Sequence, residues 1–276
     1  MKIALIQMES SSPEVEENVQ KACRHVDAAA SAGAELVVLP EFFNVPVFTL
    51  TTNKENFRLS EREAGFSIRT MAGKAREHGI YIVATIFEEA GLGLYYDTAM
   101  VIGRTGDVEG KYRKCHPAGA GTFEKFFFRP GSEFPVFRIG EWRVGINICY
   151  EWRFPEAARS LALKGAELIV MPFAASPKLK LSKALPVRAW ENVLYLAACN
   201  KVGHEGEWQS GGGSLIVDPR GDVVEEASST AEEIISAVLD KQLLFQARLE
   251  NPVYRDRRPE IYSAVVADVG SFEEPS

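Results

Sequence analysis

Residues 33–40 read Gly-Ala-Glu-Leu-Val-Val-Leu-Pro, and residues 165–172 read Gly-Ala-Glu-Leu-Ile-Val-Met-Pro. Six of the eight positions are identical, and the other two are conservative. A strand-like apolar run, at 3–7 and again at 144–148, precedes a helical pattern and then each copy. The repeat predicts two similar halves, each contributing a sheet with helices on its outer side. A chance likeness between two β-α-β units is the alternative.

Strand-like and helix-like patterns alternate along the chain. Ser12-Pro13 is typical of a helix start, with Pro at the first helical position, and Gly33 is a typical helix stop. The expected elements are strand 3–7, a helix from 13 to about 32, strand 36–39, helix 65–78, strand 80–87, and a hairpin of 96–102 with 108–112. This order predicts a layered α/β fold.

Composition limits the class of protein. The 276 residues are 46% hydrophobic, which is enough for one large core, so we expect a single domain spanning 1–276. The net charge of −7 argues against a nucleic-acid partner. The four cysteines are scattered without a CxxC pair, which indicates reduced thiols and a cytoplasmic location. No apolar run is long enough for a membrane span, and residues 1–6 resemble a strand rather than a signal peptide.

Cys149 is the first candidate for chemistry. It ends the apolar run 144–148, and a turn and a helical pattern follow at 150–156. A thiol on a sharp strand-to-helix turn is raised toward bound substrate, as in a nucleophile elbow. A buried structural cysteine is the commoner alternative.

Two charged residues upstream favour the catalytic interpretation. Glu41 follows the strand-like run 36–39, at the strand exit where open α/β sheets bind ligands. Lys114 shares a face with Val108 and Tyr112 if the segment is a regular strand, which turns Lys111 toward solvent. A buried ammonium needs a carboxylate partner, and Glu41 and Glu124 are both candidates.

Three segments together resemble the signature motifs of the nitrilase superfamily, the carbon–nitrogen hydrolases. They are Leu39-Pro40-Glu41, then 111–116 (Lys-Tyr-Arg-Lys-Cys-His), then 147–151 (Asn-Ile-Cys-Tyr-Glu), and their order and separation also fit. The resemblance reaches from the strand at 3–7 to the segment 257–262. It implies the four-layer α-β-β-α sandwich of that family, with two pseudo-repeated halves.

The resemblance also implies a reaction. Glu41 is then the base, Lys114 stabilises the tetrahedral oxyanion and Cys149 is the nucleophile, while Glu124 corresponds to the family's supporting glutamate. The expected reaction is hydrolysis of a linear amide or N-carbamoyl compound through a cysteine thioester, with no metal and no organic cofactor. The family further implies a homodimer or higher homo-oligomer, with the tail from about residue 250 at the subunit interface.

Three residues are candidates for substrate binding. The backbone N–H of Tyr150 is a candidate oxyanion donor. Arg153 resembles the arginine that holds the substrate carboxylate in hydrolases of N-carbamoyl amino acids, and an ion pair with Glu151 or Glu156 is the alternative. Phe173 follows the second copy of the repeat and is a candidate pocket wall.

Other chemistries fit parts of the pattern. Nitrile hydrolysis and acyl transfer would use the same cysteine. A zinc site on Cys115, His116 and Cys149 lacks paired ligand spacing, and a dyad of His116 with Cys149 leaves Glu41 and Lys114 unexplained. A non-catalytic binding protein is the alternative from another class.

Overall fold

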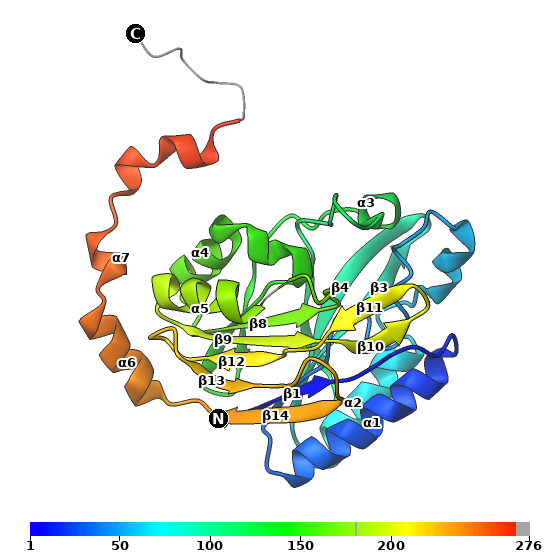
Figure 1. The fold of residues 1–276 in the computed structure, drawn as a ribbon. Coiled ribbons are helices and arrows are strands. Elements are labelled where there is room, and N and C mark those ends of the chain that lie inside the picture. Colours follow the sequence, from blue (N-terminus) through cyan, green and yellow to red (C-terminus); the bar gives the residue numbers. More distant parts are fainter. Residues whose placement is uncertain (180, 269–276) are drawn as a thin grey trace.

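The structure, a computed structural model, describes residues 1–179 and 181–268 and contains two six-stranded mixed sheets packed face to face (Figure 1). The first sheet has the order β14-β1-β2-β3-β4-β5, and the second has the order β13-β12-β9-β8-β7-β6. Strands of the first sheet are β1 (Lys2–Gln7), β2 (Leu36–Val38), β3 (Tyr81–Gly91), β4 (Leu94–Ile102), β5 (Val108–Arg113) and β14 (Glu233–Val238). Those of the second are β6 (Val136–Ile139), β7 (Trp142–Ile146), β8 (Leu168–Phe173), β9 (Tyr195–Asn200), β12 (Leu215–Val217) and β13 (Val223–Glu226). A separate hairpin pairs β10 (Val202–Glu205) with β11 (Trp208–Gly211).

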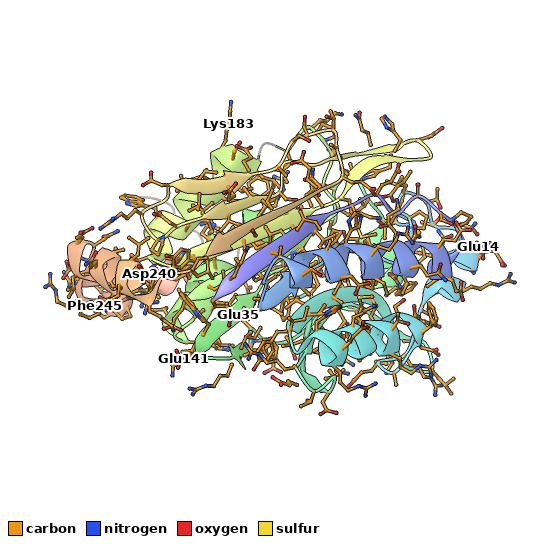
Figure 2. All side chains as sticks on the ribbon, turned by 90° about the horizontal axis from the view of Figure 1, so that it is seen from below. Glu14, Glu35, Glu141, Lys183, Asp240 and Phe245 are labelled. Carbon is orange, nitrogen blue, oxygen red and sulfur yellow. The ribbon has the colours of Figure 1, made fainter. Side chains whose placement is uncertain are left out.

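Helices cover the outer face of each sheet. The helices α1 (Val15–Ser31) and α2 (Phe66–His78) lie on the first sheet, side by side in Figure 2 as the blue and cyan ribbons. The helices α4 (Pro155–Leu163) and α5 (Leu181–Asn192) lie on the second. The main core lies between the two sheets, so the predicted α-β-β-α sandwich is confirmed.

The two halves have the same topology. β1, β2 and β3 are parallel neighbours, as are β7, β8 and β9, and each set is flanked by antiparallel strands on both sides. The pseudo-repeat predicted from the two eight-residue copies is therefore real.

The repeated sequence has a local physical cause. Gly33 (φ 86°) and Gly165 (φ 91°) turn the chain from helix to strand through the left-handed region that favours glycine. The glutamate two residues later then accepts a hydrogen bond from the neighbouring strand. Lys2 N donates to Glu35 Oε1 at 2.9 Å, and Arg143 N donates to Glu167 Oε2 at 2.9 Å. Each copy of Gly-Ala-Glu thus fixes how a strand enters its sheet.

Two local predictions were wrong. The first helix begins at Val15, because the Ser12 hydroxyl accepts from the Glu14 N–H and holds a turn there before the helix begins. Val108 and Tyr112 do not share a face. The β4–β5 pairing shifts register between Val101 and Ile102, which leaves an extra residue in β5. Val108 therefore packs toward the outer helices, while Tyr112 lies between the sheets.

The remaining helices lie around one end of the sandwich and in the tail. They are α3 (Glu124–Phe127), α6 (Lys241–Glu250), α7 (Val253–Asp256) and the 3-10 helices η1 (Lys54–Leu59), η2 (Cys149–Arg153), η3 (Pro259–Ile261) and η4 (Ser263–Val266). The tail after α6 runs away from the sheets (Figure 1), and α6 carries Phe245 at the far end of the molecule (Figure 2). Residues 269–276 of the predicted interface tail lie outside the described residues. Among the described helices, none is long and apolar enough to cross a membrane.

Candidate active site

Glu41, Lys114 and Cys149 converge at one end of the sandwich. Each follows a strand directly or within a few residues: β2, β5 and β7 respectively. Lys114 Nζ lies 2.7 Å from Glu41 Oε1, and both side chains are fully buried. Glu41 and Cys149 line a partly open cavity of about 140 Å³. A larger groove of about 660 Å³ lies under the tail and contains none of these three residues.

Cys149 occupies a strained turn. Its φ is 44°, in the left-handed region that is uncommon for residues other than glycine. Such a φ at the start of η2 turns the chain sharply out of the sheet, as predicted for a nucleophile elbow. Burial and the Glu41 carboxylate raise the pKa of Cys149 well above its usual value, against the opposing effect of Lys114. The resting group is therefore a thiol, which needs a base before it can attack.

Glu41 is held from two directions. Phe42, directly after it, also has a left-handed φ, of 54°, and its N–H donates to Thr85 Oγ1 at 3.1 Å. Thr85 in turn donates to Pro40 O at 2.9 Å. The other Glu41 oxygen, Oε2, accepts from Ala174 N at 3.0 Å. The carboxylate is thus fixed between the two halves of the protein.

Lys114 contacts three carboxyl groups. In addition to Glu41, Glu124 Oε2 lies 2.8 Å and Asp97 Oδ2 lies 3.1 Å from Nζ. Burial opposes the charge on the ammonium, but Glu124, Glu41 and Asp97 raise the pKa of Lys114 well above its usual value. Lys114 is therefore a permanent buried cation whose field reaches the Cys149 thiol. Both predicted carboxylate partners, Glu41 and Glu124, thus contact Lys114, and Asp97 is a third partner.

Sequence reasoning missed Asp97. It lies on β4 two residues before Ala99, which faces the core between the sheets. Residues 97–102 read Asp-Thr-Ala-Met-Val-Ile, so strand periodicity places Asp97 on the same face as Ala99 and Val101. That alternation was the signal for an inward-facing acidic side chain.

Glu151 was also missed as an organising residue. Its Oε2 accepts from Ile148 N at 2.7 Å, and its Oε1 accepts from Tyr112 Oη at 2.6 Å and from Cys115 N at 3.0 Å. One buried carboxylate thus connects the chain on either side of Lys114 with the turn that carries Cys149. Glu151 lies three residues after Ile148, the residue that precedes η2, and a glutamate at this position is part of a helix-capping pattern.

The predicted substrate-binding residues divide into two groups. Tyr150 and Arg153 line the cavity, and Arg153 lies over the rings of Tyr150 and Trp152. Among the described residues no carboxylate lies within 4.0 Å of Arg153, so neither ion pair weighed from the sequence forms. Phe173 lies elsewhere: its side chain is fully buried against the outer helices, because inward and outward residues alternate along β8. Ala174 and the two residues after it form the cavity wall instead.

The two cysteine alternatives lack their geometry. His116 Nδ1 lies 3.2 Å from Glu151 Oε1, and the ring stacks on Phe154 at 4.1 Å between centroids. Over residues 1–179 and 181–268, the ligand atoms of Cys115, His116 and Cys149 do not come within 4.8 Å of one another. Neither a His116–Cys149 dyad nor a zinc site on these residues fits the structure.

Comparison with known proteins agrees with this site. A family model described as carbon-nitrogen hydrolase matches residues 2–248. The chain is 39% identical to a nitrilase of Pyrococcus abyssi, covering 95% of this chain and 99% of the relative. It is 34% identical to an omega-amidase of Xenopus tropicalis, covering 91% and 93%, and 33% identical to an N-carbamoylputrescine amidase of Solanum tuberosum, covering 94% and 92%. The chain belongs to the carbon–nitrogen hydrolases of the nitrilase superfamily.

Solved structures of the family share the fold of this chain. A carbon-nitrogen hydrolase from Helicobacter pylori G27 superposes with a TM-score of 0.90 at 27% identity, covering 97% of this chain and 98% of that one. A variant of an amidase from Nesterenkonia sp. AN1 superposes with a TM-score of 0.82 at 26% identity, covering 96% of each chain. That variant carries the acetamide moiety of fluoroacetamide on its active-site cysteine. The protein is thus a carbon–nitrogen hydrolase that works through an active-site cysteine.

Proposed function

We propose that this enzyme hydrolyses the C–N bond of a linear amide or N-carbamoyl compound through a thioester on Cys149. The observation that carries the proposal is the strained turn of Cys149 in a cavity shared with Glu41 and backed by the buried Lys114. A thiol with a raised pKa beside a fixed carboxylate and a fixed cation has what acyl transfer requires: a nucleophile, a base and a partner for negative charge.

The proposed steps follow from these positions. Glu41 takes the proton of the Cys149 thiol as sulfur attacks the substrate carbon, and the carbonyl oxygen gains the charge. Lys114 and the backbone N–H of Tyr150 stabilise that oxyanion. Glu41 then gives its proton to the leaving amine as the C–N bond breaks. It next takes a proton from water as the water oxygen attacks the thioester, and it passes that proton to the Cys149 sulfur as the C–S bond breaks. The acid and the free thiol are then released.

The cavity favours a substrate whose far end is neutral or anionic. Its charged lining consists of Glu41, Glu124 and Arg153, so Arg153 is the charged group that is free for the substrate's tail. Two further lining groups, Thr122 Oγ1 and Trp208 Nε1, are buried with no hydrogen-bond partner among the described residues. Hydrogen-bond donors around a cation suit a carboxylate. An omega-amide or an N-carbamoyl amino acid therefore fits this lining better than a substrate with a cationic tail.

Intact-protein mass spectrometry tests the proposal. The enzyme is exposed to matched amides, nitriles and N-carbamoyl amines, with and without a terminal carboxylate, and the adduct mass names the group on the thiol. We expect acyl or carbamoyl adducts that the Cys149→Ala variant cannot form. That variant should also lose turnover while keeping its fold, because the change removes little volume. Full turnover by Cys149→Ala would contradict the mechanism.

Two related reactions would give different results in the same experiment. Nitrile hydrolysis would give an imidoyl adduct from nitriles, and amides would react poorly. An acyltransferase would accumulate the thioester and release product only when an amine acceptor is added.

A further inference from the structure

Three carboxyl groups surround a single buried cation. Lys114 Nζ lies 2.7 Å from Glu41, 2.8 Å from Glu124 and 3.1 Å from Asp97. The Lys114 and Asp97 side chains are 0% exposed, and those of Glu41 and Glu124 are 1% and 5% exposed. Across the parts of the chain that the structure describes, Lys114 is the cation within 4.0 Å of these carboxyls. The site therefore holds more acidic groups than it can neutralise.

Counting charges sets a limit on ionisation. If all three carboxyls were ionised, the cluster would carry two uncompensated negative charges on side chains that are at most 5% exposed. Like charges that share a buried site do not all ionise, because one of them retains its proton. At least one carboxyl beside Lys114 is therefore neutral at neutral pH.

Asp97 has the weakest support for a negative charge. Glu41 accepts from Ala174 N at 3.0 Å, and Glu124 accepts from Ala118 N at 2.7 Å. Asp97 has the longest of the three contacts with Lys114, and neither of its oxygens accepts an aligned hydrogen bond from the described residues. Hydrogen bonds to a carboxylate favour its ionised form, so their absence leaves Asp97 the easiest of the three to protonate.

The electrostatic surroundings of Asp97 agree with this assignment. Burial raises the pKa of Asp97 well above its usual value. Lys114 opposes this shift, whereas the charges of Glu41 and Glu124 and a hydrogen bond with Glu41 add to it. Burial also raises the pKa of Glu124, but Lys114 and the Ala118 N–H oppose that shift. Glu124 is therefore the competing holder of the proton.

We propose that Asp97 is protonated at neutral pH and donates its O–H to the Glu41 carboxylate, acting as a neutral positioning residue for the base. The proton stays on Asp97 and is not consumed. This leaves Glu41 and Glu124 as the two ionised partners of Lys114. In the reaction proposed above, on which the kinetic part of this inference rests, the Asp97 O–H keeps Glu41 oriented toward the Cys149 thiol.

Infrared spectroscopy tests the proton directly and does not depend on activity. At neutral pH exposed carboxyls are ionised, so a carbonyl stretch from a protonated carboxyl reports a buried one. We expect this band in the wild-type enzyme, its shift in D2O, and its loss in Asp97→Asn. The exposed Asp107→Asn, on the same β4–β5 hairpin, is the matched control and should retain the band. Absence of the band in the wild type would overturn the proposal. So would a band that survives in Asp97→Asn and disappears in Glu124→Gln.

Kinetics then show whether Asp97 acts as a neutral hydrogen-bond donor or through a negative charge. An asparagine preserves a neutral donor in the same shape, so Asp97→Asn should keep kcat within about threefold of wild type. Asp97→Ala loses that hydrogen bond, and one bond of about 1.4 kcal/mol corresponds to roughly tenfold in kcat. The pH dependence of kcat should be the same in Asp97→Asn as in wild type. Loss of activity in Asp97→Asn equal to that in Asp97→Ala would mean that a negative charge is required there, which contradicts the proposal.

Discussion

Lys114 Nζ and Glu41 Oε1 lie 2.7 Å apart although 73 residues separate them in the chain. Both side chains are fully buried. Lys114 follows β5, the edge strand of the first sheet, and Glu41 follows β2, three strands away in the same sheet. A buried ion pair with this geometry fixes the relative position of two functional groups, because either charge alone would be costly to bury. The same contact joins the proposed base to the proposed oxyanion-stabilising cation.

Lys114 should matter far more for turnover than Lys111, three residues earlier. Loss of an oxyanion donor costs on the order of 10²–10³ in kcat. We therefore expect the kcat of Lys114→Ala to be lower than that of the wild type by about that factor. Lys111 lies partly in solvent and pairs with Glu63 and Glu88, so Lys111→Ala should leave kcat nearly unchanged. Steady-state kinetics of both variants, with circular dichroism to verify folding, show which of the two lysines is required for turnover. A dead Lys111→Ala variant would contradict the assignment.

Glu41→Gln should preserve the shape of the site and remove the base. Because the pKa of Cys149 is raised, the thiol then reacts only slowly, and water is not activated to release the acyl group. We expect an adduct from reactive esters that persists in intact-protein mass spectra, with no turnover on amides. Normal turnover on amides would show that Glu41 is not the base.

Arg153 should separate substrates by the charge of their tails. If it binds a carboxylate, Arg153→Ala should raise KM for carboxylated substrates by the value of a charge-assisted bond, roughly 1.5–3 kcal/mol. Neutral amides of similar size should change little, and they serve as the internal control. An equal loss on both substrate types would indicate that Arg153 supports Tyr150 and Trp152 structurally.

Glu88 should make stability depend on acid pH. Burial opposes its charge, but hydrogen bonds from Arg113, Lys111 and Thr98 lower the pKa of Glu88 from 4.5 to about 2. Because the folded pKa is depressed, the stabilisation is complete above about pH 4.5 and is lost as pH falls toward 2. Its two cationic partners are about one-third exposed, so we expect only about 1–2 kcal/mol.

Urea unfolding at pH 7 and at pH 3 measures the contribution of ionised Glu88 to stability. The difference in unfolding free energy between wild type and Glu88→Gln should shrink at pH 3. The exposed Glu63→Gln is the control, and it should show little difference at either pH. A difference for Glu88→Gln that is the same at both pH values would contradict the assignment.

The tail should take part in self-association. It leaves apolar side chains such as Val265 and Val266 exposed beside a groove of about 660 Å³ against α4. We expect at least a dimer by light scattering at micromolar concentration, and Val266→Asp should shift it toward monomer. The control variant Leu92→Asp changes a similarly exposed residue on the β3–β4 turn, and it should leave the dimer intact. A monomeric wild type would refute the prediction.

Much of the fold and of the site followed from local pattern. The two copies of Gly-Ala-Glu-Leu predicted the paired halves, because the same helix-to-strand turn needs the same glycine and the same glutamate acceptor. Glu41 and Cys149 were found because each follows a strand-like run, and open α/β sheets bind ligands where strands end. Lys114 was chosen by strand parity even though the bulge before it broke that parity for Val108.

Contacts between distant segments decided the rest. No sequence period predicts an extra residue in a ladder, and that residue sent Val108 to the outer layer. Phe173 is apolar beside an active-site segment, but the β8 pleat turned it into the core. Asp97 and Glu151 acquired their roles only from partners far along the chain, Lys114 and Tyr112 respectively. Local residue preferences determined which elements form and which groups can react, whereas the electrostatics of the site depend on how many charges the packed sheets enclose together.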